Sequence, residues 1–458
     1  MQASNTIKWF RRIAQIPRVS GNERAISDRL VQTARGMGLE ARQDEALNVV
    51  IRKGQGTPIT LQGHMDMVGE KEAGSGHDFA SDPIQLVEKG DMLYADGTTL
   101  GADNGMAVAV MLSLMEEQDD TLPPLEALIT TGEEVGLIGA NRLTGDMLRG
   151  RALINLDAEE EGVFLTSCAG GETVHARFTP QREGTACPTL RLTLGGFRGG
   201  HSGLEIDKGR LNAIKELAAL LRQNGAQLVS LTAPGKFNAI SRQAEAVVAV
   251  QDEGTLIDRA EQALAAWRKQ EPEAVLNIAA ADPAQPMTRP ASDALLALLA
   301  AWPNGVHTMS EDLPGLVESS ANLGLIEQQG DTLTITASIR ASAPARMQEL
   351  EDAMRALCDR AGGTIEITGK YPGWAYEKES ALRDTAVRVW QDQFGQKPKL
   401  TAVHAGLECG LIKARYPDMP MLSMGPDLYD VHTPREHVSL SSVARMDAYL
   451  RALLRALA

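Results

Sequence analysis

Short apolar runs that lead into an acidic or histidine side chain are the feature of this sequence that most constrains its fold. The runs are bounded by turn residues and have the length of buried strands, and stretches with apolar residues at helical spacing lie between them. This alternation predicts an α/β layer with a mostly parallel central sheet and helices on both faces. The polar residues that follow the runs, or in one case precede a predicted helix, are His64, Asp103, Glu133, Glu134, Asp157 and His432.

The pattern of apolar residues changes after residue 171 and returns after residue 372. In the intervening residues 172–372 the strands alternate like half-exposed ones and helices are gathered between them, which predicts an inserted α+β domain. We therefore expect a catalytic domain assembled from residues 1–171 and 373–458. No linker is rich enough in proline or serine to indicate disorder.

Apolar spacing assigns individual elements to both parts of the chain. The predicted helices span residues 5–16, 22–37, 105–117, 209–222, 256–269, 345–361, 381–394 and 442–457. The predicted strands span residues 47–51, 59–61, 125–130, 152–156, 190–194, 244–250, 333–339, 364–368 and 421–424.

Composition and charge argue against several classes of partner. The formal charge of −15 comes without a run of Lys and Arg that could follow a phosphate backbone, so we expect no nucleic acid partner. No apolar stretch is long enough to span a bilayer, and the N-terminal segment lacks the apolar core of a secretion signal, so we expect no membrane partner. The four cysteines form no CxxC pair, which is typical of buried reduced thiols in a cytoplasmic protein. Any bound metal must be held by His and carboxylate side chains.

The acidic and histidine residues would meet at one edge of the predicted sheet. The carboxyl ends of parallel strands open on a common crevice, where such folds place their ligands. One His, one Asp, a pair of Glu, a second Asp and a final His would supply two metal ions that share a carboxylate. Imidazole and carboxylate ligands suit zinc and are compatible with cobalt or manganese.

The adjacent Glu133 and Glu134 indicate a division of labour. Neighbouring residues at a strand end point in different directions, so one carboxylate can bind metal while the other stays near a bound water as a general base. Each feature also has an ordinary explanation. A Glu pair is usually a solvated surface pair, a His-x-Asp sequence by itself indicates no more than a loop, and Asp103 could cap a helix. Their joint occurrence at strand ends favours the metal site.

Five further histidines are expected to be structural or solvated: His77, His175, His307, His404 and His437. Of these, His437 is the one most easily mistaken for a metal ligand, because it follows His432 closely.

With these residues in view, the sequence resembles the co-catalytic zinc peptidases, a family that includes aminoacylases, carboxypeptidase G and the cytosolic dipeptidases. The segments that carry the resemblance are QGHMDMVG (62–69), GTTLGADNG (97–105), TTGEEVGLIGAN (130–141), NLDAEEEG (155–162), GGHSG (199–203), NAISRQAE (238–245), VHAGLECG (403–410) and the stretch 425–436. They span nearly the whole chain in the order of the family. The likeness is greatest to the bacterial dipeptidases of the aminoacyl-histidine or nonspecific type.

The resemblance implies two zinc ions per subunit. His64 and Asp157 would bind one ion, Glu134 and His432 would bind the other, and Asp103 would bridge the two.

It also implies roles for the neighbours of these ligands. Asp66 would orient the His64 imidazole, and Glu133 would be the general base. The peptide bond between Asp103 and Asn104 would be cis.

In the same comparison, the inserted domain resembles the lid of the family. His201 would stabilise the oxyanion at the scissile carbonyl. Asn238 and Arg340 would hold the C-terminal carboxylate of the substrate, and the planar fork of an arginine suits that task. Glu408 could receive the free amine of the substrate. The resemblance is compatible with a homodimer, although an insert of this size could complete the site within one chain.

The expected activity is hydrolysis of dipeptides, of the Xaa-His type or with broad specificity, by a water that bridges two zinc ions, with Glu133 as the base. One alternative is an N-acyl amino acid deacylase that uses the same site. A second is a catalytically silent scaffold or peptide-binding protein of the same fold, against which the complete ligand set argues. The family's usual Ile-Pro after the lid asparagine reads Ile240-Ser241 here, so this turn could differ.

Overall fold

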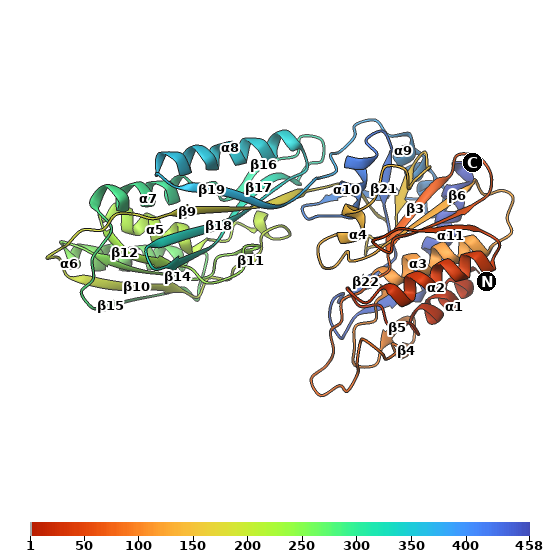
Figure 1. The fold of residues 1–458 in the computed structure, drawn as a ribbon, viewed down its shortest axis with the longest axis horizontal. Helices are drawn as coiled ribbons and strands as arrows, with labels where there is room; N and C mark the ends of the chain where they lie inside the picture. The colour runs from red at the N-terminus through yellow and green to blue at the C-terminus, as the bar shows by residue number, and fades with distance from the viewer. Residues whose placement is uncertain (1) are drawn as a thin grey trace. The chain divides into compact units, whose positions relative to one another are not determined.

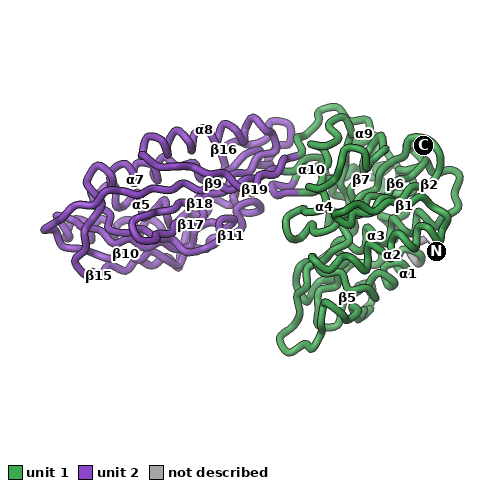
Figure 2. The backbone as a smooth tube through the Cα atoms, viewed as in Figure 1, with its two compact units in different colours: residues 1–168, 374–402, 407–458 green, residues 169–373, 403–406 purple. Residues whose placement is uncertain are grey.

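The computed structural model describes residues 2–458 and divides into two compact units (Figures 1 and 2). The first unit contains the chain up to residue 168 together with residues 374–402 and 407–458, and the second contains residues 169–373 and 403–406. The sequence predicts these divisions at 171/172 and 372/373. The segment 403–406, which the sequence assigned to the catalytic domain, belongs to the second unit, where the carbonyl of Val403 accepts a hydrogen bond from the amide of Ala169 (3.1 Å).

The first unit is built on an eight-stranded mixed sheet. In spatial order its strands are β1 (Glu40–Gln43), β2 (Val49–Lys53), β6 (Leu125–Thr130), β3 (Ile59–His64), β7 (Leu153–Asn155), β21 (Met421–Ser423), β8 (Val163–Cys168) and β20 (Lys399–Val403). The central strands β6, β3, β7 and β21 run parallel, whereas β1, β2 and β8 pair antiparallel with their neighbours. The expected parallel sheet is thus found at the centre. On one side β1 and β2 form an antiparallel hairpin, and on the other β8 pairs antiparallel with β21.

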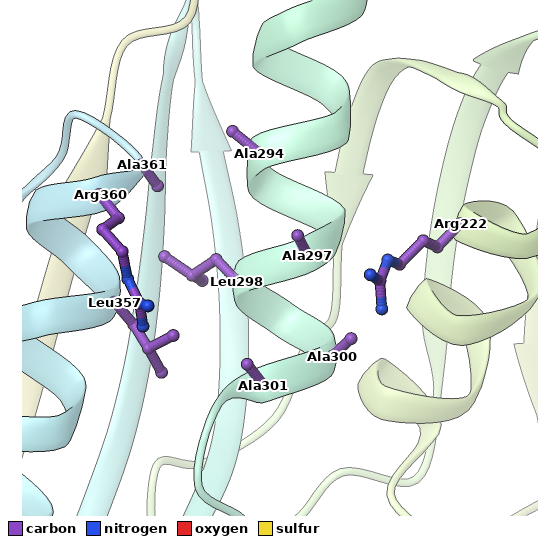
Figure 3. Close-up of a pocket in the computed structure, with 9 residues that line it drawn as sticks. All are labelled: Arg222, Ala294, Ala297, Leu298, Ala300, Ala301, Leu357, Arg360 and Ala361. Carbon is purple, nitrogen blue, oxygen red and sulfur yellow. The ribbon is translucent and has the colours of Figure 1, made fainter.

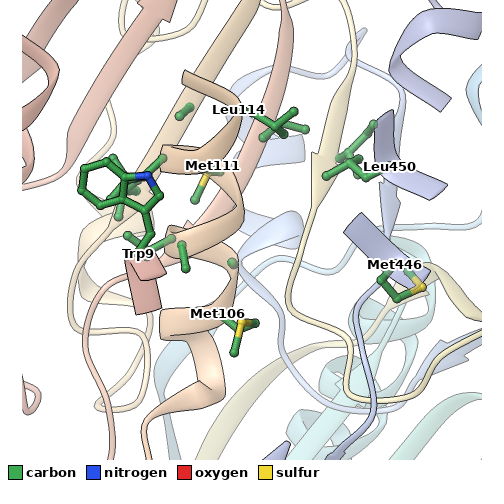
Figure 4. Close-up of a cluster of buried hydrophobic side chains, with 14 of the residues drawn as sticks. Trp9, Met106, Met111, Leu114, Met446 and Leu450 are labelled. Atoms are coloured by element: carbon green, nitrogen blue, oxygen red, sulfur yellow. The ribbon is translucent and has the colours of Figure 1, made fainter. Parts of the chain in front are cut away.

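Helices cover this sheet, and the longer ones share a hydrophobic core with it. They are α1 (Gln2–Ile13), α2 (Arg24–Gly36), α3 (Ala102–Glu116), α4 (Ile138–Asn141), α9 (Ala381–Phe394), α10 (Glu408–Arg415) and α11 (Leu440–Ala456). Helix α3 is apolar on almost every side and therefore lies in the interior, where it contacts α1 and β3. Figure 4 shows Met106, Met111 and Leu114 of α3 near Trp9 of α1 and near the α11 residues Met446 and Leu450. The buried start of α3 is where Asp103 lies.

A small four-stranded sheet completes the first unit. In spatial order its strands are β22 (Leu428–Tyr429), β23 (His437–Ser439), β5 (Met92–Ala95) and β4 (Leu86–Lys89). The loop that carries His432 connects β22 to β23, so this sheet anchors both ends of that loop.

The second unit is an antiparallel α+β structure, as the sequence predicts for the insert. Its five-stranded sheet has the order β16 (Gly305–Met309), β17 (Val317–Gln329), β18 (Thr332–Ala341), β9 (Gly170–Phe178) and β19 (Thr364–Tyr371). Its four-stranded sheet has the order β12 (Gln227–Thr232), β14 (Ala244–Ala249), β10 (Thr189–Gly195) and β15 (Val275–Ala280), and the short strands β11 (Gly200–His201) and β13 (Ala239–Ile240) pair with each other. The helices are α5 (Ala213–Gln223), α6 (Glu253–Trp267), α7 (Arg289–Ala301) and α8 (Pro344–Arg360).

Helix α7 has an alanine-rich surface that lines a groove on the second unit. Figure 3 shows Ala294, Ala297 and Ala301 on this helix, with Arg222 of α5 on one side and Arg360 of α8 on the other. The small side chains leave the backbone of α7 close to the surface of the groove.

Several elements of the second unit escaped prediction. Helix α7 and the long strand β17 lie in a region for which the sequence analysis assigned no element. The apolar alternation of β17 is interrupted by a register shift between Leu323 and Leu325, which hides its period of two. Among the described residues, no helix is both long enough and apolar enough to cross a membrane.

Candidate active site

The parallel centre of the sheet brings the predicted ligands to one edge. His64 is the last residue of β3, Asp157 lies two residues beyond β7, and Glu133 and Glu134 follow β6 in the loop that begins after Thr130. Because β3, β6 and β7 run parallel, their carboxyl ends lie together.

Asp103 and His432 reach this edge from outside the sheet. Asp103 lies in the first turn of α3, where its backbone is not helical (φ −81°, ψ 109°). The peptide bond between Asp103 and Asn104 is cis, as the resemblance implies. His432 adopts a left-handed conformation (φ 62°), which residues other than glycine rarely adopt and which occurs preferentially at functional sites.

The five predicted ligands form two clusters that share Asp103. In the first cluster, His64 Nε2 lies 3.2 Å from Asp103 Oδ1 and 3.5 Å from Asp157 Oδ1. In the second, His432 Nε2 lies 3.1 Å from Asp103 Oδ2 and 3.0 Å from Glu134 Oε1. The two oxygens of Asp103 therefore face different histidines, which is the arrangement a bridging carboxylate requires.

Asp66 contacts both His64 of the first cluster and the backbone amides of Glu133 and Glu134. Its Oδ1 lies 3.4 Å from His64 Nδ1, on the side of the ring opposite the cluster. The carboxylate also accepts hydrogen bonds from the amides of Glu133 (3.1 Å) and Glu134 (3.3 Å) and from the hydroxyl of Ser20 (2.8 Å). Burial raises the pKa of Asp66, but the bonds to His64 and Ser20 outweigh it, so the net pKa is lowered and the carboxylate stays charged.

Glu133 and Glu134 occupy different positions in the site. Glu134 contacts His432, whereas Glu133 Oε2 approaches the set only at 4.0 Å from His64 Nε2. Burial raises the pKa of Glu133, and the nearby carboxylates of Asp157, Glu408 and Glu134 raise it further. Glu134 thus lies among the predicted ligands, and Glu133 lies beside them.

The donor set fits two divalent cations. Three groups of His and carboxylate atoms lie within 4.8 Å of one another: His64 with Asp103 and Asp157, Asp103 with Glu134 and His432, and His64 with Glu133 and Glu134. Burial raises the pKa of Glu134 and Asp157, and repulsion by the Asp103 carboxylate raises both further. Imidazole nitrogen and carboxylate oxygen are ligands that zinc accepts, and a cation would relieve this repulsion.

Glu436 holds the loop that carries Asp103, a role that sequence reasoning missed. Its carboxylate accepts hydrogen bonds from four consecutive backbone amides, those of residues 100–103, at 2.8–3.2 Å. The Arg18 guanidinium, which is also fully buried, donates to the carbonyls of Met65 (2.9 Å) and Gly101 on the same side of the site. The sequence does contain a signal for Glu436, because it follows His432 by four residues within the segment 425–436 that carries the family resemblance.

A buried row of polar side chains crosses the sheet directly below the ligands. Ser423, Asn155 and Gln62 lie in register on β21, β7 and β3, and they are joined by hydrogen bonds of 2.5 Å (Ser423 to Asn155) and 2.6 Å (Asn155 to Gln62). Gln62 and Thr130 of β6 then both donate to Glu408 Oε2, at 2.5 and 2.6 Å. Polar residues in the middle of an otherwise apolar sheet are the signal that could have revealed this row.

Glu408 thus lies inside the first unit, with no exposed surface. Its Oε1 has no hydrogen-bond partner, and burial raises the pKa of its carboxyl to about 7. Asn104 is a further residue that the sequence reasoning did not single out: its side-chain amide donates to the Asp157 carboxylate and to the carbonyl of Leu156 (3.1 Å).

The remaining predicted site residues belong to the second unit. His201 and Asn238 are brought together by the β11–β13 pairing, in which His201 lies opposite Ala239 and the amide of Ser202 donates to the carbonyl of Asn238 (3.0 Å). The side chain of Asn322 on β17 donates to the carbonyls of Phe237 (3.0 Å) and Ala239 (2.9 Å) and so fixes this loop. Ser241 is buried and its hydroxyl donates to the carbonyl of Gln243 (3.2 Å), so the turn closes without the family's proline.

The ring of His201 has a defined tautomer. Its Nδ1 lies 3.2 Å from the amide of Gly203 and 3.1 Å from that of Leu204, so Nδ1 accepts and Nε2 carries the proton. Burial and the charge of Arg340 lower the pKa of His201, which keeps the ring neutral near neutral pH. A neutral ring with an Nε2 proton can donate a hydrogen bond to a developing oxyanion.

Arg340 lies close to His201 in the same unit. A Cβ atom on Gly203 would stand 3.1 Å from the His201 ring and 3.2 Å from Arg340 Nε, so both side chains border this glycine. The carbonyl of His404 lies at the same place, and the His404 ring is hydrogen bonded to Ser320 through Nε2 (2.7 Å). The expectation that His404 is structural agrees with this bond, but its position beside Arg340 was not foreseen.

His437 is not part of the ligand set. Its ring stacks between Tyr94 (4.6 Å between centroids) and Tyr429 (5.0 Å), and its Nδ1 is bonded to the carbonyl of Arg435 (2.8 Å).

Known proteins share both the sequence and the fold of this chain. The model of peptidase family M20/M25/M40 matches residues 60–456. Cytosol non-specific dipeptidase from Escherichia coli (strain K12) is 34% identical over 465 residues, covering 97% of this chain and 96% of the relative. The crystal structure of aminoacylhistidine dipeptidase from Vibrio alginolyticus superposes with a TM-score of 0.91 at 34% identity, covering 98% of this chain and 96% of that one. Aminopeptidase PepT from Bacillus cereus shares the fold at a TM-score of 0.58 and 15% identity, covering 99% and 98% of the two chains.

Proposed function

Because this chain belongs to peptidase family M20/M25/M40, we propose that it is a metal-dependent dipeptidase that cleaves Xaa-His dipeptides or dipeptides of broad sequence. The observation that carries the proposal is the pair of His–carboxylate clusters that share Asp103. The names of the two relatives that match this chain over almost its full length, both dipeptidases, support the choice of substrate.

In this proposal the two clusters hold two zinc ions, for which cobalt or manganese could substitute. His64 and Asp157 would hold one ion, Glu134 and His432 would hold the other, and Asp103 would contribute to both. When bound, the ions would supply Lewis acidity, which lowers the pKa of water and polarises a carbonyl oxygen.

Glu133 acts as the general base. It lies beside the clusters, without the close contact to a histidine that the proposed carboxylate ligands make. Its raised pKa makes it a better proton acceptor than an exposed carboxylate. It would take a proton from the attacking water and deliver it to the leaving amine. Asp66 would keep the His64 ring oriented throughout.

The second unit would bind the substrate as a lid. His201 would donate from Nε2 to the oxyanion, an interaction worth about 3 kcal/mol in the transition state. Asn238 and Arg340 would hold the C-terminal carboxylate, and closure would exclude water. Glu408 would receive the substrate amine through Oε1, which has no partner among the described residues. Because its side chain has no exposed surface, this contact requires the structure around Glu408 to open first.

The first experiment compares free dipeptides, including Xaa-His, with their N-acetylated forms on zinc-restored protein. We expect the free peptides to be cleaved and the acetylated forms to be spared, because Glu408 would have no amine to receive. Glu133→Ala should lower kcat about 1,000-fold while metal content is kept. Cleavage of the blocked peptides alone would instead assign an N-acyl amino acid deacylase, and bound zinc without any turnover would contradict both activities.

Metal identity and assembly are separate proposals. We propose two zinc ions per chain, to be counted by elemental analysis, with Glu134→Ala expected to lose metal where Glu133→Ala does not.

We also propose a homodimer and a cytoplasmic location. The family resemblance supports the dimer, and the name of the Escherichia coli relative supports the location. Light scattering of the purified chain tests the homodimer, and cell fractionation tests the cytoplasmic location.

A further inference from the structure

Arg340 lies in a row of four residues that crosses the five-stranded sheet of the second unit. Ser320 on β17 is opposite Arg340 on β18, Arg340 is opposite Gly171 on β9, and Gly171 is opposite Tyr371 on β19. Residues directly opposite one another in a sheet direct their side chains to the same face. Ser320, Arg340 and Tyr371 therefore share one face, with a glycine between the arginine and the tyrosine.

We infer that Tyr371 is a positioning residue for Arg340 and thereby helps to determine specificity for a substrate with a free C-terminal carboxylate. This inference rests on the proposed function, in which Arg340 binds that carboxylate. The direct contact is a hydrogen bond of 3.0 Å from Arg340 Nη1 to the Tyr371 hydroxyl.

A β-bulge brings Tyr371 into the row. Thr368 of β19 is opposite Thr173 of β9, and the next paired residues are Tyr371 and Gly171, so β19 has one residue more than β9 between these pairs. Without the extra residue, Lys370 would lie opposite Gly171. Lys370 instead pairs with Glu172 (3.2 Å) and Glu351 (3.5 Å). Bulges commonly redirect a side chain beside a functional site, and here the bulge replaces a second cation with a neutral hydroxyl.

Gly171 makes the contact between Arg340 and Tyr371 sterically possible. A Cβ atom at this position would lie 2.5 Å from the Tyr371 hydroxyl oxygen and 2.7 Å from the ring carbon that carries it. Any other residue would displace the ring from the row. The central strand therefore leaves open the space through which the side chains of its two neighbours meet.

The Arg340 guanidinium keeps hydrogen-bond donors that no neighbour in this row uses. The hydrogen bond to Tyr371 uses Nη1, and Nε is buried without a partner among the described residues. On the other side of the row, Ser320 is bonded to the ring of His404. The neighbours of Arg340 in this row are thus neutral hydroxyl and imidazole groups, which hold it in place without neutralising it. A preorganised fork binds a carboxylate more tightly because less side-chain freedom is lost on binding.

The test is the variant Tyr371→Phe, which keeps the ring and removes only the hydroxyl. For free dipeptides we expect KM to rise about tenfold with kcat changed by less than about twofold, the size of effect expected for one hydrogen bond to a charged group. For dipeptide amides, which lack the carboxylate, KM should stay unchanged. Tyr376→Phe is the matched control, because Tyr376 lies in the first unit and its ring contacts Arg383.

A second variant and a binding measurement keep the two proposals separable. Gly171→Ala should reproduce the loss of preference for the free carboxylate without removing any polar group. Calorimetric binding of glycyl-leucine and glycyl-leucinamide, in a Glu133→Ala background, reports the same preference without turnover. If the unmodified chain cleaves dipeptides and Tyr371→Phe keeps the full preference for the free carboxylate, the inference is wrong and the proposed function stands. If the chain does not cleave dipeptides but Tyr371→Phe still loses that preference in binding, the proposed function is wrong and the role of Tyr371 stands.

Discussion

The carboxylate of Glu436 fixes the backbone that precedes the proposed bridging ligand. It accepts the amides of residues 100–103 although it is itself buried, and it belongs to the segment that also supplies His432. Partners of this kind, which do not touch the metal, typically change metal affinity when they are removed.

We predict that Glu436→Gln weakens zinc binding about 10-fold to 100-fold. The amide keeps the size of the side chain but presents N–H groups to backbone amides that are themselves donors, so the loop that carries Asp103 loses its anchor. Titration of chelated protein with zinc against a chromophoric chelator measures the change. Glu349→Gln on the exposed surface of α8 is the control, and an unchanged affinity of Glu436→Gln would show that this loop is held by other contacts.

We predict that His404 makes the stability of the second unit depend on pH. Burial lowers the pKa of His404 to about 4, and the charge of Arg340 contributes. The ordinary pKa of histidine is about 6.5, so below that pH the unfolded chain binds a proton that the folded unit excludes. Stability should therefore fall as the pH falls from about 6.5 to about 4, by at most about 3 kcal/mol. Below that window His404 should cause no further change in stability.

Denaturant unfolding of the second unit at pH 7, 5.5 and 4 measures this dependence. We expect His404→Gln to flatten the profile, whereas His307→Gln, on an exposed part of β16, should leave it as it is. A profile of the same steepness in His404→Gln would assign the dependence to other groups.

At the scale of elements, a side chain of one helix satisfies the end of another. Lys215 on α5 donates from Nζ to the carbonyls of Leu299 (2.9 Å), Ala300 (2.7 Å) and Trp302 (2.8 Å), at the C-terminus of α7. These carbonyls have no partner within their own helix, and a cation at this end also opposes the helix dipole.

We predict that Lys215→Met destabilises the second unit by about 2 kcal/mol, because it leaves these carbonyls without a donor while it keeps the apolar stem. Urea unfolding measures the change, and Lys269→Met, at an exposed position beyond α6, is the control. Equal stability of the two variants would mean that water replaces Lys215 at the end of α7.

The elements that carry the proposed metal ligands were the ones most readily predicted. Strands β3, β6 and β7 and helix α3 have strong apolar patterns that belong to a buried layer, and they were located within a few residues. Strand β17 was missed because a register shift breaks its period of two. Helix α7 was missed because no residue in the surrounding sequence assigns it a role.

At the scale of the whole molecule, the two units have separate hydrophobic cores. All five proposed metal ligands belong to the first unit, whereas His201, Asn238 and Arg340 belong to the second. Zinc should therefore stabilise one unit and leave the other unaffected, because only a ligand that binds the folded state stabilises it.

We predict that chelation lowers the melting temperature of the first unit and leaves that of the second unchanged. At zinc concentrations about 100 times the dissociation constant, each site should contribute about 2.7 kcal/mol to the stability of the first unit. Scanning calorimetry of chelated and zinc-restored protein measures both transitions, with His432→Ala as the variant that should lose most of the shift. A shift of neither transition would contradict the proposed metal centre.

The sequence by itself determined the fold class, the inserted second domain and the residue types that meet at the sheet edge. It could do so because strand and helix periods are local properties and because the carboxyl ends of parallel strands must meet. The family also followed from local segments, and the resemblance to it implied the cis bond after Asp103.

Only the tertiary structure decided which distant residues support that site. The bonds from Glu436 to residues 100–103, from Glu408 to Gln62 and Thr130, and from Arg340 to Tyr371 join segments that are far apart in the chain. The contacts of Gln62, Thr130 and Tyr371 depend on strand register, and for Tyr371 a single extra residue in β19 selects which side chain enters the row. The contact of Glu436 instead depends on how the loop between β22 and β23 packs against residues 100–103. Register is set by packing against neighbouring strands, so no local pattern in the sequence specifies it.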